Sequence, residues 1–355
     1  MKTIITGGAG FIGSNASSRY LKRGHQVVVV DNLARDGVGE NLEWLRSHEA
    51  HAGPGKSAAL EFHQVDVRDF PGVRGVFGRH RDADQVLHLA AQVAVTTSVR
   101  DPREDFEINA LGTFNVLEAM RQSGMRAPLI YSSTNKVYGE MTSVGVVERD
   151  GRYDYQSLPT GVSEEHNLDF HSPYGCSKGS ADQYVIDYHR IYGLRSTVFR
   201  QSCIYGYRQF GAEDQGWVAW FMIASQLGRP ITIYGDGKQV RDILFIDDLL
   251  DAYDAAFAAP DKAAGRAFNI GGGVSNVVSL RDLLAFIEQR SGGKIRAGSA
   301  DWRPGDQKVF ISDIRRAGTE LGWSPKIGCP QGLGLLYDWI EKNRELFLKL
   351  SPTLV

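Results

Sequence analysis

Short apolar runs alternate with longer amphipathic stretches over the first 200 residues. The runs are rich in β-branched and aromatic residues and have the length of buried strands, whereas the stretches between them are long enough for helices. An alternation of strand and helix predicts a parallel sheet covered by helices on both faces, which is a doubly wound α/β fold. The expected strands are 2–6, 26–30, 62–65, 85–89, 129–132 and 196–200, and the expected helices include 106–123, 173–192 and one that ends near Arg23.

Beyond Tyr205 the regular alternation gives way to shorter elements in which glycine, aromatic and charged residues mix. This change predicts a second, smaller α/β lobe. We expect residues 1–202 to form the first domain, with 240–274 returning to it, and residues 203–239 and 275–355 to form the smaller lobe. Within these parts we expect a strand followed by a helix over 243–259, and helices over 279–291 and 332–348.

Composition and charge restrict the class of protein. The chain has 355 residues, of which 42% are hydrophobic, and a formal net charge of −2. Such a charge gives no reason to expect nucleic acid or a membrane surface as a partner. Three cysteines do not suggest a disulfide framework, and no apolar run reaches the length of a membrane span, so a cytoplasmic location is expected. No metal site is expected either.

The segment 35–59 contains a polar, glycine-bearing loop and is expected to be the most mobile stretch of the first domain. Within it, Gly53-Pro54-Gly55-Lys56-Ser57 resembles part of a triphosphate-binding loop. That motif needs a glycine at position 50, where this chain has Ala50, and a strand just upstream. A surface loop is therefore expected.

The segment TGGAGFIG at positions 6–13 follows the first expected strand and opens a helix. Glycines at this spacing allow a tight turn and a close backbone approach to a pyrophosphate, and the helix N-terminus supplies N–H donors. The alternative is a tight turn with no ligand. The context predicts a Rossmann dinucleotide site that includes Gly7, Gly10, Phe11, Ile12 and Gly13.

Polar and small residues follow the next strands at the same edge of the predicted sheet. Asp31, beside Asn32, is placed to accept hydrogen bonds from the adenosine ribose and would repel a 2′-phosphate, which favours NAD over NADP. Two further groups are expected at the cofactor, although a strand-end cap and dense core packing are the respective alternatives. They are Asp66 with Val67, and Leu89 with Ala90 and Ala91.

A Tyr-x-x-x-Lys pair lies in the middle of the chain. Tyr174 and Lys178 are four residues apart on an expected helix and therefore share a face. A nearby ammonium and a cationic nicotinamide favour the phenolate and lower the tyrosine pKa. Thr134, at the end of the strand that contains Ser132, can hold the same substrate oxygen. These residues predict proton transfer coupled to hydride transfer, with Lys178 also holding the nicotinamide ribose.

Together these motifs resemble the extended short-chain dehydrogenases/reductases that act on nucleotide sugars, over essentially the whole chain. Within that class, four strings resemble CDP-tyvelose (CDP-paratose) 2-epimerases. The strings are SSTNKVYG at 132–139, HSPYGCSKG at 171–179, DQGW at 214–217 and GKQVRD at 237–242.

The residues after Thr134 bear on the reaction. Relatives that eliminate water carry Asp and Glu there as acid and base, whereas this chain has Asn135 and Lys136. An amide cannot cycle a proton, so dehydration is disfavoured. Sugar 4-epimerases usually have small residues at these positions. Asn135 and Lys136 could instead only shape the loop.

The resemblance implies oxidation at C2 of the hexose, formation of a 2-keto sugar and reduction on its other face, with NAD regenerated. It implies that Asn109 acts as a relay behind Lys178, a core hydrogen bond being the alternative. It further implies a nucleoside-diphosphate sugar held by the smaller lobe, for which guanidinium groups are suited. For the arginines the alternative is a surface charge, and for Trp217 it is core packing. The substrate residues expected are Thr134, Asn135, Lys136, Gln201, Arg208, Gln209, Gln215, Trp217, Arg241, Arg303 and Asp306.

Two other functions stay open on the sequence. One is 4-epimerisation or another oxidoreduction of a nucleotide sugar that uses the same tyrosine. The other is a binding protein that senses NAD, although such a protein does not need Thr134, Tyr174 and Lys178 together. The helices 106–123 and 174–192 resemble those that form dimer interfaces in this class, so a homodimer or homotetramer is expected.

Overall fold

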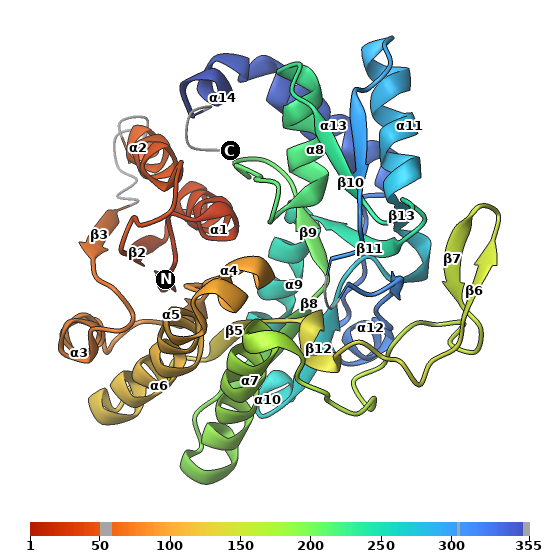
Figure 1. Cartoon of the computed structure of the whole chain (residues 1–355). Coiled ribbons are helices and arrows are strands. Elements are labelled where there is room, and N and C mark those ends of the chain that lie inside the picture. The colour runs from red at the N-terminus through yellow and green to blue at the C-terminus, as the bar shows by residue number, and fades with distance from the viewer. Residues whose placement is uncertain (50–58, 304–305, 351–355) are drawn as a thin grey trace.

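The computed structural model describes residues 1–49, 59–303 and 306–350 (Figure 1). Its largest sheet has seven parallel strands in the order β12-β8-β5-β4-β1-β2-β3. The strands are β1 (Lys2–Thr6), β2 (Gln26–Asp31), β3 (Leu60–Gln64), β4 (Gln85–His88), β5 (Leu129–Thr134), β8 (Ser196–Gln201) and β12 (Ala267–Ile270). The doubly wound α/β fold is thus confirmed, and each expected strand lies within two residues of its predicted bounds.

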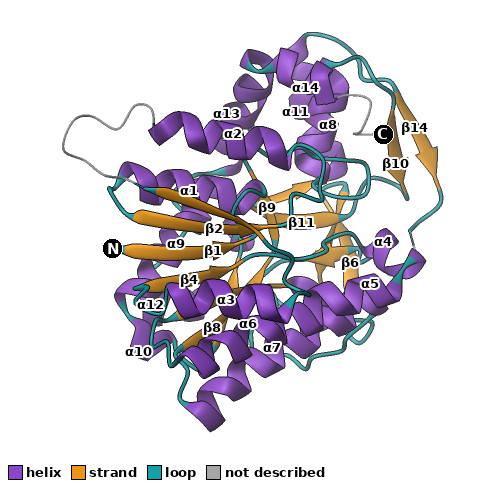
Figure 2. Cartoon of the chain, turned by 90° about the vertical axis from the view of Figure 1, so that its left-hand side faces the viewer, coloured by secondary structure: helices purple, strands orange, loops and turns teal. Residues whose placement is uncertain are grey.

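Alternating side chains bury both faces of this sheet. On β1, Ile4 belongs to one apolar cluster and the adjacent Ile5 to another, because successive strand residues point to opposite faces. One cluster is closed by α3 (Phe70–Arg79), α6 (Gly112–Ser123) and α7 (Ser172–Tyr192), and the other by α1 (Phe11–Lys22), α2 (Val38–Glu49) and α9 (Ile246–Ala258). Figure 2 shows α3, α6 and α7 below the sheet and α1 above it. The near-continuous apolar strands are explained by this burial on both sides.

The smaller sheets lie in the second half of the chain, apart from one hairpin. The four-stranded sheet contains β9 (Cys203–Tyr205), β11 (Val240–Phe245), β13 (Val277–Ser279) and β15 (Val309–Phe310). Two-stranded sheets are formed by β10 (Ile231–Tyr234) with β14 (Ala297–Ala300), and by β6 (Val146–Arg149) with β7 (Arg152–Tyr155). The remaining helices are α4 (Val95–Arg100), α5 (Pro102–Phe106), α8 (Trp217–Gln226), α10 (Pro260–Ala263), α11 (Leu280–Ser291), α12 (Arg315–Leu321), α13 (Cys329–Lys342) and α14 (Arg344–Leu350). None of the described helices is both long and apolar enough to cross a membrane.

The segment 35–59, where a polar loop was expected, also contains α2 over Val38–Glu49, a helix that the sequence did not predict. Leu42 and Leu45 are buried there against the face that carries α1. Their spacing is helical, and the polar residues between them hid this pattern. The triphosphate-loop resemblance at 53–57 falls outside the described residues.

Two predicted helices are interrupted. The helix expected over 106–123 begins with a π-helical turn, η1 (Glu107–Leu111), which widens the backbone before α6. The helix expected over 332–348 starts three residues earlier, with Pro330 in its first turn, and is divided at Asn343 into α13 and α14. Sequence periodicity does not detect such interruptions, because the apolar spacing continues across them.

The turn after β1 is held by backbone contacts that leave no room for side chains. Gly7 has φ +68°, and a Cβ on it would lie 2.7 Å from the backbone nitrogen of Ala90. A Cβ on Gly13 would lie 2.0 Å from the carbonyl oxygen of Gly7. The ends of β1 and β4 and the start of α1 therefore meet at van der Waals distance, at the point where the strand order reverses.

Replacing Gly13 by alanine is expected to destabilise the protein, because the clash is with backbone and cannot be relieved by rotating a side chain. We expect a loss of at least about 2 kcal/mol in the free energy of unfolding, measured by denaturant titration. The matched control is Gly75→Ala in α3, where the nearest atom to the new Cβ is 3.9 Å away. That control should be neutral or stabilise by up to about 1 kcal/mol, and an unchanged stability in Gly13→Ala would contradict the turn geometry.

Candidate active site

A cavity of about 250 Å³ lies where the carboxyl ends of β5 and β8 face the start of α1 and the start of α8. Ligands bind at this edge of an open parallel sheet, beside the reversal of strand order. The cavity is lined by Phe11, Ile12, Leu89, Val93, Ser132, Ser133, Thr134, Tyr174, Lys178, Gln201, Ser202, Cys203, Ile204, Gln209, Gln215, Gly216, Trp217 and Val218. It thus joins the start of α1, the Tyr-x-x-x-Lys pair and the start of α8.

Helix α7 places Tyr174 and Lys178 in this cavity. Pro173 stands in the first turn of the helix, and the backbone N–H of Tyr174 donates to Ser98 Oγ at 3.2 Å. The ammonium of Lys178 donates to the carbonyl oxygen of Ser132 at 2.6 Å and lies 4.3 Å from the centre of the Tyr131 ring. Lys178 is thereby fixed against β5, the strand that ends in Thr134.

Burial controls the protonation of both groups. It raises the pKa of Tyr174 to about 12, against a hydrogen bond with Thr134 that lowers it. Burial also lowers the pKa of Lys178 to about 7, and the negative charges of Asp105 and Asp182 oppose that shift. The sequence expectation of a lowered tyrosine pKa includes the charge of bound NAD⁺, whereas in the protein chain alone desolvation of the phenolate is the largest effect and raises that pKa.

Asp105 is a carboxylate near Tyr174 and Lys178 that nothing in the sequence pointed to. It is 1% exposed and accepts hydrogen bonds from Ser177 Oγ at 2.5 Å, Gln92 Nε2 at 2.9 Å and Asn109 Nδ2 at 3.1 Å. Its negative charge acts on Lys178 through the buried interior. No local signal marks Asp105, since only the packing of α5 and η1 on α7 brings it there.

The same contacts place Asn109. Its amide donates to Ser177 Oγ at 3.2 Å and to the carbonyl oxygen of Gln92 at 3.0 Å. Asn109 therefore stands in the buried network behind Lys178 and ties the π-helical turn to α7.

The residues at the glycine turn fit a dinucleotide. Gly7 and Gly13 have no Cβ, so the backbone stays close to the cavity. Gly10 is the N-cap residue of α1 and has no side chain that could bond to the N–H groups of the first turn. Asp31 is 9% exposed and is held by the backbone N–H of Ala9 at 3.1 Å and of Leu33 at 2.9 Å. Asn32 donates to Asp66 at 2.8 Å and so joins the ends of β2 and β3.

The expected substrate residues fall into two groups. Thr134, Gln201, Gln209, Gln215 and Trp217 line the cavity. The others are Asn135, Lys136, Arg208, Arg241, Arg303 and Asp306, which are not among its lining residues.

Arg208 is engaged elsewhere in the described chain. It donates to Asn41 Oδ1 at 2.8 Å and stacks 4.6 Å from the centre of the Trp44 ring, so it connects the loop after β9 to α2. Arg241 pairs with Asp306 at 2.6 Å. Arg303 pairs with Asp214 at 3.1 Å and lies over the ring of Tyr234.

Asn135 is 8% exposed, and Thr134 Oγ1 lies 3.3 Å from its side-chain oxygen. Burial lowers the pKa of Lys136 to about 8, and the positive charge of Arg241 acts in the same direction. Lys136 and the Arg241–Asp306 pair therefore belong to one charged region next to the cavity.

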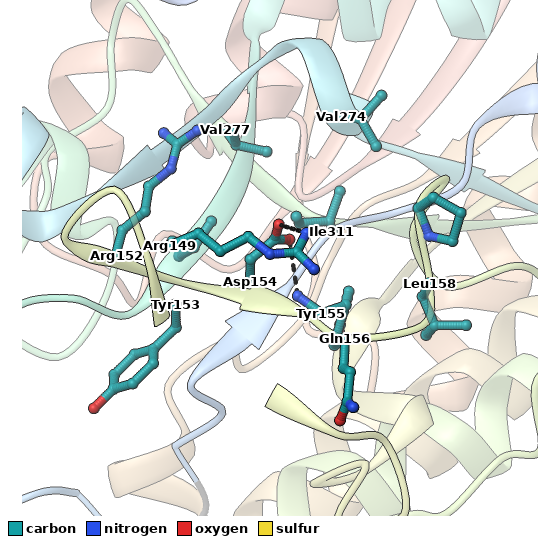
Figure 3. Close-up of a pocket in the computed structure, with 12 residues that line it drawn as sticks. Arg149, Arg152, Tyr153, Asp154, Tyr155, Gln156, Leu158, Val274, Val277 and Ile311 are labelled. Atoms are coloured by element: carbon teal, nitrogen blue, oxygen red, sulfur yellow. Dashed lines mark hydrogen bonds and ion pairs between the residues drawn. The ribbon is translucent and has the colours of Figure 1, made fainter. Parts of the chain in front are cut away.

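Sequence reasoning missed the apolar lining residues Val93, Ile204 and Val218. A larger cavity of about 470 Å³ lies between the β6–β7 hairpin and strands β11 and β13 (Figure 3). Its polar residues include Arg149 and Asp154, which pair at 3.1 Å, and its floor is formed by valine and isoleucine. The 250 Å³ cavity, and not the larger one, contains the hydroxyl, phenol and ammonium groups that proton transfer requires.

Comparisons with known proteins agree with this geometry. Residues 3–271 match the model of the NAD dependent epimerase/dehydratase family. The chain therefore belongs to that family and is an NAD-dependent enzyme of the extended short-chain dehydrogenase/reductase class.

Particular relatives are similar over nearly the whole chain. The chain is 44% identical to the CDP-paratose 2-epimerase of Salmonella typhi, over 96% of this chain and 99% of that one. Among solved structures it resembles the UDP-glucose 4-epimerase of Thermotoga maritima with UDP-glucose, with a TM-score of 0.81 and 31% identity over 97% of this chain and all of that one. It also resembles the UDP-glucose 4-epimerase of Thermus thermophilus in complex with NAD, with a TM-score of 0.77 and 32% identity over 96% and 99% of the two chains.

Replacing Asp105 by asparagine is expected to move the pH profile of activity to lower pH. The carboxylate raises the pKa of both Lys178 and Tyr174, so its removal lowers both. The ammonium is then lost at lower pH, and the phenolate forms at lower pH, so both limbs of a plot of kcat/KM against pH should shift in the acid direction. The matched control is Glu107→Gln in η1, a carboxylate paired with Arg103 at the surface, which should leave the profile in place. A profile for Asp105→Asn that loses height without moving would mean that Asp105 acts only through packing.

Proposed function

We propose that this enzyme inverts C2 of the hexose of a nucleoside-diphosphate sugar, of the CDP-paratose/CDP-tyvelose or CDP-glucose type, through a transient 2-keto sugar. The observation that carries the proposal is the 44% identity to a CDP-paratose 2-epimerase, together with an intact Thr134, Tyr174 and Lys178 in one cavity. The solved relative with UDP-glucose also supports a nucleotide sugar as the substrate.

The chain's residues supply the proton chemistry. Tyr174 removes the proton of the C2 hydroxyl while Thr134 holds the same oxygen, and the C2 hydrogen leaves as hydride. NAD, when bound, supplies the acceptor and later the donor of that hydride. Tyr174 returns the proton to the same oxygen when the planar carbonyl is reduced on its opposite face, which would give the inverted alcohol. Lys178 retains its charge most readily below its pKa of about 7, which Asp105 supports.

Asn135 and Lys136 argue against dehydration. Elimination of water needs an acid and a base beside the sugar, and an amide supplies neither. Lys136 is instead a buried amine close to Arg241. We propose that this region holds anionic groups of the substrate, with Arg241, Arg303 and Asp306 rearranging from their present ion pairs.

A second candidate is 4-epimerisation. The resemblance to two UDP-glucose 4-epimerases favours it, because the same Tyr174 can act on a C4 hydroxyl if the sugar is turned in the cavity. The two reactions differ in their products, and both leave NAD unconsumed.

The deciding experiment is proton NMR of the enzyme with CDP-paratose, and in parallel with CDP-, UDP-, GDP- and ADP-glucose, without added reductant. A new set of signals with inverted C2 is expected from a CDP-sugar. Tyr174→Phe should lower the rate by about 10²–10⁴-fold while the protein retains NAD. A galacto product, inverted at C4, would overturn C2 as the reacting carbon.

We also propose the division of the chain into a domain of residues 1–202 with 240–274, and a smaller lobe of residues 203–239 and 275–355. The return of α9 and β12 to the seven-stranded sheet supports it. Strand β11 does not fit this division. Its residues 240–245 fall in the segment that was assigned to the first domain, but β11 pairs with β9, β13 and β15 of the smaller sheet.

We propose a homodimer or homotetramer in which α6 and α7 form an interface. Large apolar side chains are exposed along the segment from α5 to α6 and along α7, and such patches mark interaction surfaces. They are Phe106 at 55%, Leu111 at 39%, Phe114 at 37%, Tyr184 at 50%, Ile191 at 61% and Tyr192 at 54%.

Carboxylates on this surface should separate the subunits, because burying a charge without a partner is costly. The double variant Phe106→Glu/Tyr184→Glu is expected to halve the mass measured by sedimentation velocity. The control Val274→Glu changes a residue that is 51% exposed but lies beside the β6–β7 hairpin, and it should keep the wild-type mass. A monomeric wild-type protein would contradict the proposed assembly.

A further inference from the structure

Two histidines and a glutamate meet at the edge of the seven-stranded sheet, outside the active site. Glu61 and His63 are two residues apart on β3, so their side chains share a face of that edge strand. His80 is the C-cap residue of α3. Glu61 Oε1 lies 2.8 Å from His63 Nε2 and 3.3 Å from His80 Nε2. Each residue offers one ligand-type atom, and these atoms all lie within 4.8 Å of one another.

The ring of His80 is buried, but hydrogen bonds do not satisfy its nitrogens. The residue is 6% exposed, and within the described residues neither of its buried ring nitrogens has a hydrogen-bond partner. Its Nε2 lies 3.3 Å from Glu61 Oε1 as an ion-pair contact, whereas its Nδ1 has no such neighbour in the described residues. An unpaired buried nitrogen costs free energy, and such groups call for an unseen water or ion.

The two spacings that involve Glu61 suit a small tetrahedral cation, and the two histidine nitrogens lie within 4.8 Å of each other. Zinc binds imidazole nitrogen and carboxylate oxygen at about 2.0–2.2 Å, which separates neighbouring ligand atoms by about 3.4 Å in a tetrahedron. The 3.3 Å separation matches this value, and the 2.8 Å separation needs a shift of about half an ångström. Glu61 has a 40% exposed side chain, so solvent can provide a fourth ligand.

We propose that Glu61, His63 and His80 bind one transition-metal ion, with zinc as the preferred ion, as a structural clip between β3 and the end of α3. Two histidines and a carboxylate select such metals over magnesium or calcium, which prefer oxygen ligands. The clip links residues 63 and 80 through the metal ion and fixes the edge strand to the helix that covers it. Figure 1 shows β3 and α3 at the left-hand margin, away from α8 and β9 of the smaller lobe.

Two cations stand near the cluster. Arg79 Nη2 lies 3.5 Å from His63 Nδ1. This side chain is in an exposed position, so it can turn into solvent and leave that nitrogen to carry the proton when Nε2 binds a metal. Lys2 acts on His80 only at longer range, and its ammonium is paired with Asp82 at 2.7 Å.

The test uses the full chain, purified without a histidine tag and dialysed against chelator. Isothermal titration with ZnCl₂ should give one ion per chain, and equimolar zinc should raise the thermal midpoint. MgCl₂ should do neither. Cobalt(II) should give the visible absorption of a four-coordinate ion, and zinc should remove it.

His80→Gln should weaken zinc binding by at least about tenfold and abolish the thermal shift. Glu61→Gln, a half-exposed position, provides the same measurement if His80→Gln does not fold. The matched control is His171→Gln, which removes a histidine that lies 3.0 Å from Glu140. Within residues 1–49, 59–303 and 306–350, no third metal-ligand residue is grouped with this pair. This control should bind zinc as wild type does. No zinc binding to the wild-type chain, or binding unchanged in both His80→Gln and Glu61→Gln, would overturn the proposal.

Discussion

The close backbone contact between the ends of β1 and β4 and the start of α1 is the constraint on which the site depends. Gly7 and Gly13 have no Cβ, so the chain can turn within van der Waals distance of Ala90. This crossing places the first turn of α1 at the point where the strand order reverses. Every other group of the site is arranged around that edge, because the parallel strands all end there.

Burial is the second constraint, and it acts on the chemistry directly. A phenol and an ammonium taken out of water both move toward their neutral forms, which explains why the pKa of Tyr174 rises and that of Lys178 falls. Asp105 and Asp182 offset this effect for Lys178. The protonation of Tyr174 and Lys178 is therefore set by the packed interior between β5, η1 and α7, and not by the Tyr-x-x-x-Lys spacing alone.

The sequence predicted which motif residues lie together, but it did not predict which neighbours several polar side chains contact. Thr134, Tyr174 and Lys178 line one cavity, as expected from strand ends and helix periodicity. Arg208 illustrates the opposite case, since its guanidinium packs on Trp44 and bonds to Asn41 of α2. A single arginine in a loop gives no local indication of which neighbour it will meet. The helix α2 was missed for a related reason, as its apolar residues are sparse and are buried only against the face that carries α1.

Local sequence by itself determined six of the seven strands of the largest described sheet, the glycine turn, the positions of Thr134, Tyr174 and Lys178, and the family. These features depend on periods of two or 3.6 residues, or on backbone conformations that only glycine adopts easily. Both can be recognised from residues that are close together in the sequence. Tertiary structure alone decided which distant side chains meet: Asp105 with Ser177, Lys136 with the region of Arg241, and His80 with Glu61 and His63. The physical reason is that these contacts join residues from separate elements, so they exist only after the sheet, its helices and the smaller lobe have packed together.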